Sequence, residues 1–201
     1  MRVVAQIISY VFHPLMMPIA GTIILFNTHS YINYALSPEL KRAVLILVGT
    51  NTLAMPLLVA LLLLNRKWIG SLAMETRKER TIPYAITIVF YVVALFLLKQ
   101  APVPSVLLHF LIGTTLSVFV ALVVNSRWKI SAHAIGIGGI VGVLLFVSIL
   151  LEIYITPYLV IALLAAGLVG TSRLILNSHT PNQVYAGFLI GLLCQFITAF
   201  F

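Results

Sequence analysis

Two histidines stand beside serine and arginine residues in a chain that is otherwise mostly hydrocarbon. Ser131 lies two residues before His133, and Ser172-Arg173 is followed after five residues by His179. An arginine can hold a phosphate through paired hydrogen bonds, and a histidine can act as a nucleophile or as a general acid–base near neutral pH. Ionisable groups are costly at membrane depth, so grouped ones indicate a functional site. These residues therefore predict one site that handles an anion.

The elements that must position this site are transmembrane helices. The chain has 201 residues, of which 62% are hydrophobic and 8% charged, and its mean hydropathy is +1.15. Its apolar runs are long and continuous, whereas barrel strands alternate with a period of two residues. We therefore expect an all-α, polytopic transmembrane helical bundle of about six to seven spans. The predicted spans cover residues 3–26, 42–64, 82–99, 105–124, 131–151, 157–173 and 182–201.

Little of the chain remains outside these spans. We therefore expect a single integral membrane domain over residues 1–201, placed in the bacterial inner (cytoplasmic) membrane. The first apolar stretch lacks a small-residue cleavage site, which favours a retained helix over a signal peptide. The only cysteine, Cys194, excludes an intramolecular disulfide and a cysteine-based metal site.

The formal charge of +8 comes from 12 Lys and Arg against 4 Asp and Glu. In a soluble protein this balance would suggest nucleic acid as a partner, but here the basic residues cluster at helix ends. There they can meet lipid headgroups or a phosphate. We therefore expect membrane lipids and a phosphorylated substrate as partners, and no nucleic acid.

Chain alternation brings the most polar loops to one side of the membrane. With seven spans, loops 65–81, 125–130 and 174–181 all fall on the side of the N-terminus. The positive-inside rule alone would collect basic residues there and would make that side cytoplasmic. It does not explain two histidines and two serines among them. This convergence favours one shared site.

Other polar or small residues have structural interpretations. His13 precedes Pro14 inside the first span, which favours a kink with a hydrogen-bonded imidazole over a functional role. The glycines of segment 136–142 predict close helix packing. Tyr84, near a helix end, is typical of an interfacial anchor.

The site residues resemble the motifs of the type 2 phosphatidic acid phosphatase superfamily, which includes the vanadium haloperoxidases. The third family motif is Ser-Arg, five residues, His, three residues and Asp. Ser172, Arg173 and His179 match it, but Gln183 stands where the motif has Asp. The second motif, Pro-Ser-Gly-His, is matched in part by Ser131 and His133.

The first motif, a lysine, six residues and Arg-Pro, is matched loosely by Arg80 and Pro83. Lys78 stands closer to this arginine than the motif spacing requires. The resemblance covers approximately residues 65–195, which it implies form a lipid-phosphatase-like core. Members of this superfamily usually have the active site on the extracytoplasmic side, whereas the charge asymmetry predicts the cytoplasmic side.

The resemblance implies a role for each residue. His179 would attack phosphorus and form a phosphohistidine, and His133 would protonate the leaving group. Gln183 would orient His179 through its carbonyl oxygen, although it carries no charge. No metal or other cofactor is implied. The phosphoryl oxygens would be held by Arg173, Arg80, Ser131 and Lys78.

Two hypotheses follow. The first is a membrane-embedded phosphatase of lipid metabolism that hydrolyses a lipid phosphate or prenyl diphosphate, whose tail stays in the bilayer while its headgroup reaches a basic pocket. The second is a non-catalytic relative that binds anionic headgroups or scaffolds a membrane partner, which Gln183 favours. A small transporter is a weaker alternative, because the chain lacks paired intramembrane carboxylates and an inverted repeat.

Overall fold

The computed structural model describes residues 1–198, without the side chain of Leu150, and every regular element in this range is a helix. The predicted all-helical membrane bundle is confirmed. The first six predicted spans correspond to six helical segments that are long and apolar enough to cross a membrane. These segments are Arg2–Asn27, Pro38–Asn65, Arg77–Lys99, Ser105–Asn125, Ala132–Ile149 and Thr156–Ile175.

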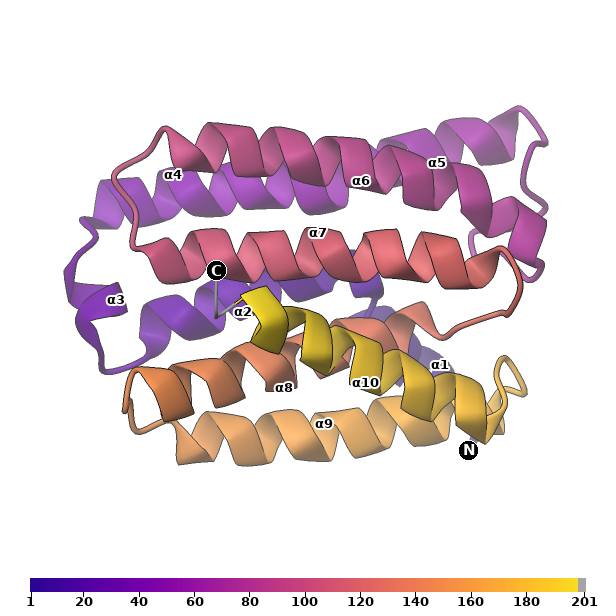
Figure 1. Ribbon diagram of the computed structural model, residues 1–201. Helices are drawn as coiled ribbons and strands as arrows, with labels where there is room; N and C mark the ends of the chain where they lie inside the picture. Colours follow the sequence, from indigo (N-terminus) through magenta and orange to yellow (C-terminus); the bar gives the residue numbers. More distant parts are fainter. Residues whose placement is uncertain (199–201) are drawn as a thin grey trace.

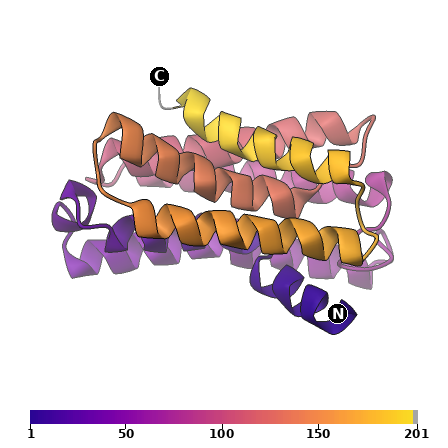
Figure 2. The same ribbon diagram turned by 90° about the horizontal axis from the view of Figure 1, so that it is seen from below.

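The seventh predicted span corresponds to α10 (Pro181–Thr198), and its last predicted residues, 199–201, lie outside the described range. Length and composition do not place α10 among the six membrane-crossing segments. It nevertheless packs along α8 (Ala132–Leu150) and α7 (Ser105–Asn125), inside the same bundle (Figures 1 and 2).

The first span is broken at a proline. Pro14 has no N–H to donate and disfavours helical backbone at the residue before it. His13 is accordingly extended, with φ −63° and ψ 136°, and its Nδ1 accepts a hydrogen bond from the Leu15 N–H at 3.3 Å. The predicted kink with a bonded imidazole is present. The span thus consists of α1 (Arg2–Val11), the short η1 (Pro14–Met16) and α2 (Met17–Asn27).

A second break lies in the next span, which follows the one-turn helix α3 (Tyr31–Tyr34). A π-helical turn precedes Pro56, which again cannot donate a backbone hydrogen bond. This turn packs against η1, so the two irregular segments meet inside the bundle. The span consists of α4 (Pro38–Gly49), η2 (Thr50–Ala54) and α5 (Met55–Asn65).

Glycines let α8 and α10 approach closely. A Cβ at Gly142 would lie 2.7 Å from the Leu192 carbonyl oxygen on α10, and Gly138 faces the backbone of Phe188. The predicted close packing is present at both positions. Gly139 differs, because the nearest atom to its Cβ position would be Gln195 Nε2 at 3.8 Å.

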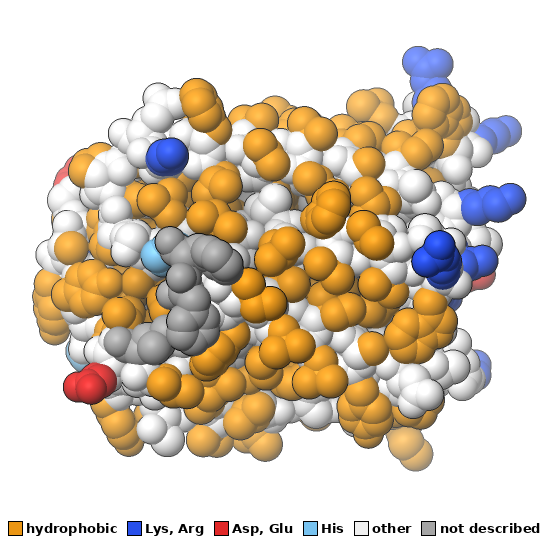
Figure 3. Space-filling model, in the orientation of Figure 1, with side chains coloured by type: hydrophobic (Ala, Val, Ile, Leu, Met, Phe, Trp, Pro, Cys, Tyr) orange, Lys and Arg blue, Asp and Glu red, His pale blue; other side chains and the backbone are white. Residues whose placement is uncertain are grey.

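The predicted polar loops lie together at one end of the bundle (Figure 1). They join α5 to α6 (Arg77–Lys99), α7 to α8, and α9 (Thr156–Ile175) to α10. Most of the visible Lys and Arg side chains gather at this end, which we call the basic end (Figure 3). These loops follow the second, fourth and sixth spans, and the prediction that they lie on the same side is confirmed.

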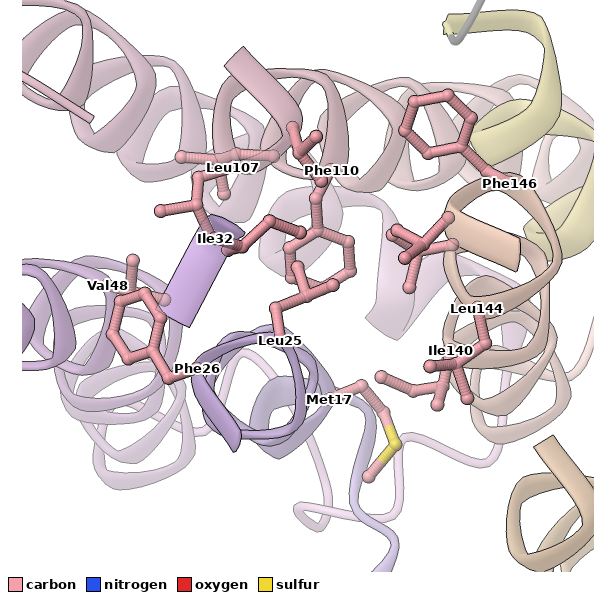
Figure 4. Packing of buried hydrophobic residues seen from close by; sticks show 14 of the residues in the cluster. Met17, Leu25, Phe26, Ile32, Val48, Leu107, Phe110, Ile140, Leu144 and Phe146 are labelled. Carbon is pink, nitrogen blue, oxygen red and sulfur yellow. The ribbon is translucent and has the colours of Figure 1, made fainter. Parts of the chain in front are cut away.

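Buried hydrophobic side chains close the interior away from the basic end. Leu25 of α2, Phe110 of α7 and Leu144 of α8 pack into one cluster and are at most 4% exposed (Figure 4). This cluster ties the first half of the chain to the second.

Candidate functional site

Four of the predicted site residues line one cavity of about 680 Å³ that begins at the basic end. Arg80 comes from the first turn of α6, His133 from the first turn of α8, and Arg173 from the last turn of α9. His179 lies in the loop between α9 and α10. Four separate segments thus deliver two imidazoles and two guanidiniums to a shared space.

Two main-chain carbonyls fix Arg80. Its Nε donates to the Met74 oxygen at 2.8 Å, and its Nη1 donates to the Ile130 oxygen at 3.0 Å. The side chain is only 7% exposed. Because neutral carbonyls leave the positive charge uncompensated, Arg80 remains available to an anion in the cavity.

Arg173 has an unused donor. Its Nη1 donates to the Ser9 hydroxyl at 2.9 Å. Its Nε is buried and has no hydrogen-bond partner among the described residues. A buried N–H on a charged group costs free energy unless an acceptor is supplied. The guanidinium is therefore prepared for an acceptor that arrives with a ligand.

Gln183 contacts His179 as predicted. The Gln183 Oε1 lies 3.0 Å from His179 Nδ1 and 3.2 Å from the Thr180 main-chain nitrogen. Because the Thr180 N–H can only donate, Oε1 is the acceptor in both contacts, and the proton of the neutral imidazole lies on Nδ1. The lone pair of His179 is consequently on Nε2.

Electrostatics keep His179 neutral. Burial lowers the pKa of His179 to about 3, and the charge of Arg80 acts in the same direction. The pKa of the half-buried Lys129 is also lowered, first by burial and then by Arg80. A concentration of positive charge at a partly buried site disfavours further protonation and favours a bound anion.

His133 bonds the backbone of the first helix. Its Nε2 lies 3.1 Å from the Ser9 carbonyl oxygen, and its ring meets that of His13 edge to face at 5.7 Å between centroids. A carbonyl only accepts, so Nε2 carries a proton and Nδ1 is the atom left for a reacting group. His133 would then deliver a proton from Nδ1 only when both ring nitrogens are protonated.

The proline break makes the Ser9 carbonyl available. In an uninterrupted helix the His13 N–H would bond the Ser9 oxygen four residues earlier. Since α1 ends at Val11, that oxygen is one of the terminal carbonyls without a helical donor. Ser9 thus uses its carbonyl for His133 and its hydroxyl for Arg173.

Ser131 and Lys78 do not line the cavity, contrary to the predicted phosphate contacts. Ser131 is fully buried, and its hydroxyl caps α8 by accepting the Ala134 N–H at 3.3 Å. Lys78 is exposed, because residues two apart on a helix face different ways and Arg80 faces inward.

Three cavity residues were missed or misjudged from the sequence. Tyr84 lines the cavity one turn after Arg80, so its prediction as an interfacial anchor was wrong. The spacing of four residues on one helix could have revealed it. His13 also lines the cavity, in addition to its structural role. Ser9 was the least visible, because a lone serine within a span commonly bonds its own helix, as its hydroxyl does to Ala5 at 2.8 Å.

Comparison with known proteins identified no relative of this chain. No protein-family model, curated protein or solved structure matches the chain. The arrangement of Arg80, His133, Arg173 and His179 in one cavity remains the feature that indicates a function.

Proposed function

We propose that the protein is a membrane-embedded phosphatase that hydrolyses a lipid phosphate or prenyl diphosphate, as a divergent member of the type 2 phosphatidic acid phosphatase superfamily. The observation that carries this proposal is the buried Arg173 Nε without an acceptor, in the same cavity as His179 and Arg80. A phosphoryl group supplies acceptor oxygens and negative charge together.

The proposed reaction has two steps. His133 enters the reaction with both ring nitrogens protonated. The lone pair on His179 Nε2 attacks phosphorus, an N–P bond forms, and the P–O bond to the lipid breaks while His133 gives its Nδ1 proton to the departing oxygen. Water then attacks phosphorus, His133 takes its proton, and the N–P bond breaks to release inorganic phosphate. Arg80 and Arg173 would neutralise the phosphoryl oxygens, the main requirement of phosphoryl transfer.

A second candidate function is the binding of anionic headgroups without turnover. Gln183 favours it, because an amide oxygen orients His179 but stabilises a positive imidazole less than a carboxylate would. The neutral form of His133 also favours it, since the Nε2 proton bonds the Ser9 carbonyl and Nδ1 must bind a second proton before His133 can act as an acid.

Phosphate release from a panel of lipid phosphates distinguishes the two functions. We expect His179→Ala to lower kcat by about 10³-fold or more, and His133→Ala to lower it strongly. His29→Ala is a matched control, because His29 is exposed in the loop at the other end of the bundle. If purified wild-type protein releases no phosphate above background yet binds the same lipids through Arg173, the binding function replaces the enzymatic one.

A further inference from the structure

The cavity at the basic end continues into the membrane interior. Along α6 its lining runs from Arg80 to Tyr91, a distance of about 16 Å at roughly 1.5 Å per residue. Thr114 of α7 and Gln195 of α10 line it as well. The cavity thus has a charged mouth and a long extension toward the centre of the bundle.

The walls of the extension suit hydrocarbon. The hydroxyls of Thr114 and Ser117 are occupied by their own helix, bonding the Phe110 and Gly113 carbonyls at 2.7 and 2.8 Å. Gln195 Nε2 likewise bonds the Phe110 carbonyl at 3.2 Å. Tyr84, one turn after Arg80, has a buried hydroxyl without a hydrogen-bond partner among the described residues. The walls otherwise offer mainly apolar surface, from residues such as Leu57, Val118 and Ile140. A hydrated ion gains little there, whereas an alkyl chain packs favourably.

The volume limits how much hydrocarbon can enter. If each carbon group occupies about the 30 Å³ that a water molecule takes in the liquid, a cavity of about 680 Å³ holds roughly 20 groups. A phosphate uses five of them at the charged mouth, and a diphosphate uses nine. Room then remains for one chain of roughly 10 to 15 carbons, but not for two full-length acyl chains.

We infer that the substrate's hydrocarbon chain lies inside this cavity rather than in the bilayer, so that the protein selects phosphate esters or diphosphates that carry a single hydrocarbon chain. This inference rests on the proposed function, because the phosphoryl group at Arg173 and His179 anchors the chain. It replaces the expectation that the tail stays among the lipids.

A cavity-filling substitution provides the first test. A Cβ at Gly139 would make only ordinary contacts, the closest at 3.8 Å to Gln195 Nε2, so Gly139→Leu can extend its side chain into the cavity. Gly167→Leu is the matched control, because a Cβ at this exposed α9 position would meet no atom within 4 Å.

The measurement compares kcat/KM for four probes in detergent: a prenyl diphosphate, a single-chain acylglycerol phosphate, a diacylglycerol phosphate and water-soluble p-nitrophenyl phosphate. We expect both single-chain lipids to be preferred over the diacyl lipid. In Gly139→Leu the kcat/KM for single-chain lipids, relative to p-nitrophenyl phosphate, should fall about 10-fold or more. Gly167→Leu should retain the wild-type ratio. An equal response to one and two chains, or an unchanged ratio in Gly139→Leu, overturns the inference.

Failure of the proposed function would be visible separately. If none of the four probes is hydrolysed, the protein is not this phosphatase, and chain placement is decided by crosslinking. A single-chain alkyl phosphonate with a photoreactive group at the tail end should label Thr114 or Gln195. Labelling confined to the exposed Val92 or Phe119, on the outer surfaces of α6 and α7, would place the chain in the bilayer and overturn the inference.

Discussion

Gln183 shows how one atom sets the chemistry of its neighbour. Its Oε1 accepts from the Thr180 N–H and therefore fixes the proton of His179 on Nδ1. The amide supplies the tautomer that a nucleophilic Nε2 needs. It does not supply the negative charge that would stabilise the phosphohistidine, and this difference can be tested.

Replacing Gln183 with Glu should raise kcat. A carboxylate of similar length keeps both acceptor contacts and adds a charge, and a charged hydrogen bond is about 1.4 kcal/mol stronger than a neutral one, or about tenfold in rate. The measurement is the rate of phosphate release. Asn182→Asp is the control, because Asn182 is exposed and this substitution adds a negative charge one residue away from Gln183. A decrease in Gln183→Glu would mean that the neutral amide is required.

Acid should destabilise the protein through His179. The unfolded imidazole binds a proton below its ordinary pKa of about 6.5, whereas the folded one resists protonation down to its pKa of about 3. Between these values the unfolded state binds more protons, so the free energy of unfolding falls as the pH falls.

Thermal unfolding in detergent between pH 4.5 and 7.5 measures this effect. We expect the midpoint to decrease toward acid pH more steeply in wild type than in His179→Gln, which lacks the titrating group. His29→Gln, which removes an imidazole from the exposed loop at the other end of the bundle, is the control. Parallel curves for wild type and His179→Gln would show that this imidazole is not held neutral by the fold.

Among the helices, the break in the first span has the clearest effect on the geometry of the candidate site. Pro14 ends α1 early and leaves the Ser9 carbonyl to His133. Had the helix continued, the His13 N–H would have occupied that carbonyl. An interruption that costs helical hydrogen bonds thus provides an acceptor at the site.

Pro14→Ala should therefore impair acid–base catalysis by His133 and leave phosphate binding unchanged. With helix restored through residue 13, we expect kcat to fall by about tenfold, the value of one or two lost hydrogen bonds, while KM changes little. Steady-state kinetics on one lipid phosphate separate the two constants. Pro104→Ala, before α7 at the opposite end, is the control. A rise in KM with unchanged kcat would contradict this role.

Element-level properties were accessible from the sequence to different degrees. Hydropathy identified the first six spans, and their parity brought loops 65–81, 125–130 and 174–181 to one end. The direction in which individual side chains point could not be predicted from the sequence. Lys78 and Arg80 are equally basic, and only the packing of α6 decides which one faces inward. Ser131 could have been recognised as an N-cap from its place before a helix, a role that occupies its hydroxyl.

At the scale of the whole molecule, charge is distributed unequally between the two ends (Figure 3). The predicted loops at the basic end hold most of the Lys and Arg residues, while the opposite end retains Lys41, Arg42 and Lys99. The positive-inside rule predicts that the basic end, and the cavity mouth, face the cytoplasm, whereas the family resemblance predicts the opposite side.

Cysteine labelling tests this orientation. In a Cys194→Ser background, Ser71→Cys in the loop before α6 should react with a membrane-impermeant maleimide only after the cells are permeabilised. Gln100→Cys, at the opposite end, should react in intact cells. The reverse pattern would place the site outside the cytoplasm, as members of the phosphatase superfamily usually have it.

The dual role of Ser9 has a consequence for biosynthesis. Membrane proteins are made from the N-terminus, so α1 is inserted long before the segments that carry Arg173 and His179. Until α9 and α10 emerge, the Ser9 hydroxyl has no guanidinium from which to accept a hydrogen bond, and neither His179 nor the Arg173 nitrogen without an acceptor is present. Under the proposed function, a partly synthesised chain would therefore be unable to hydrolyse any lipid phosphate. Competence arises only when the last helices dock against the first.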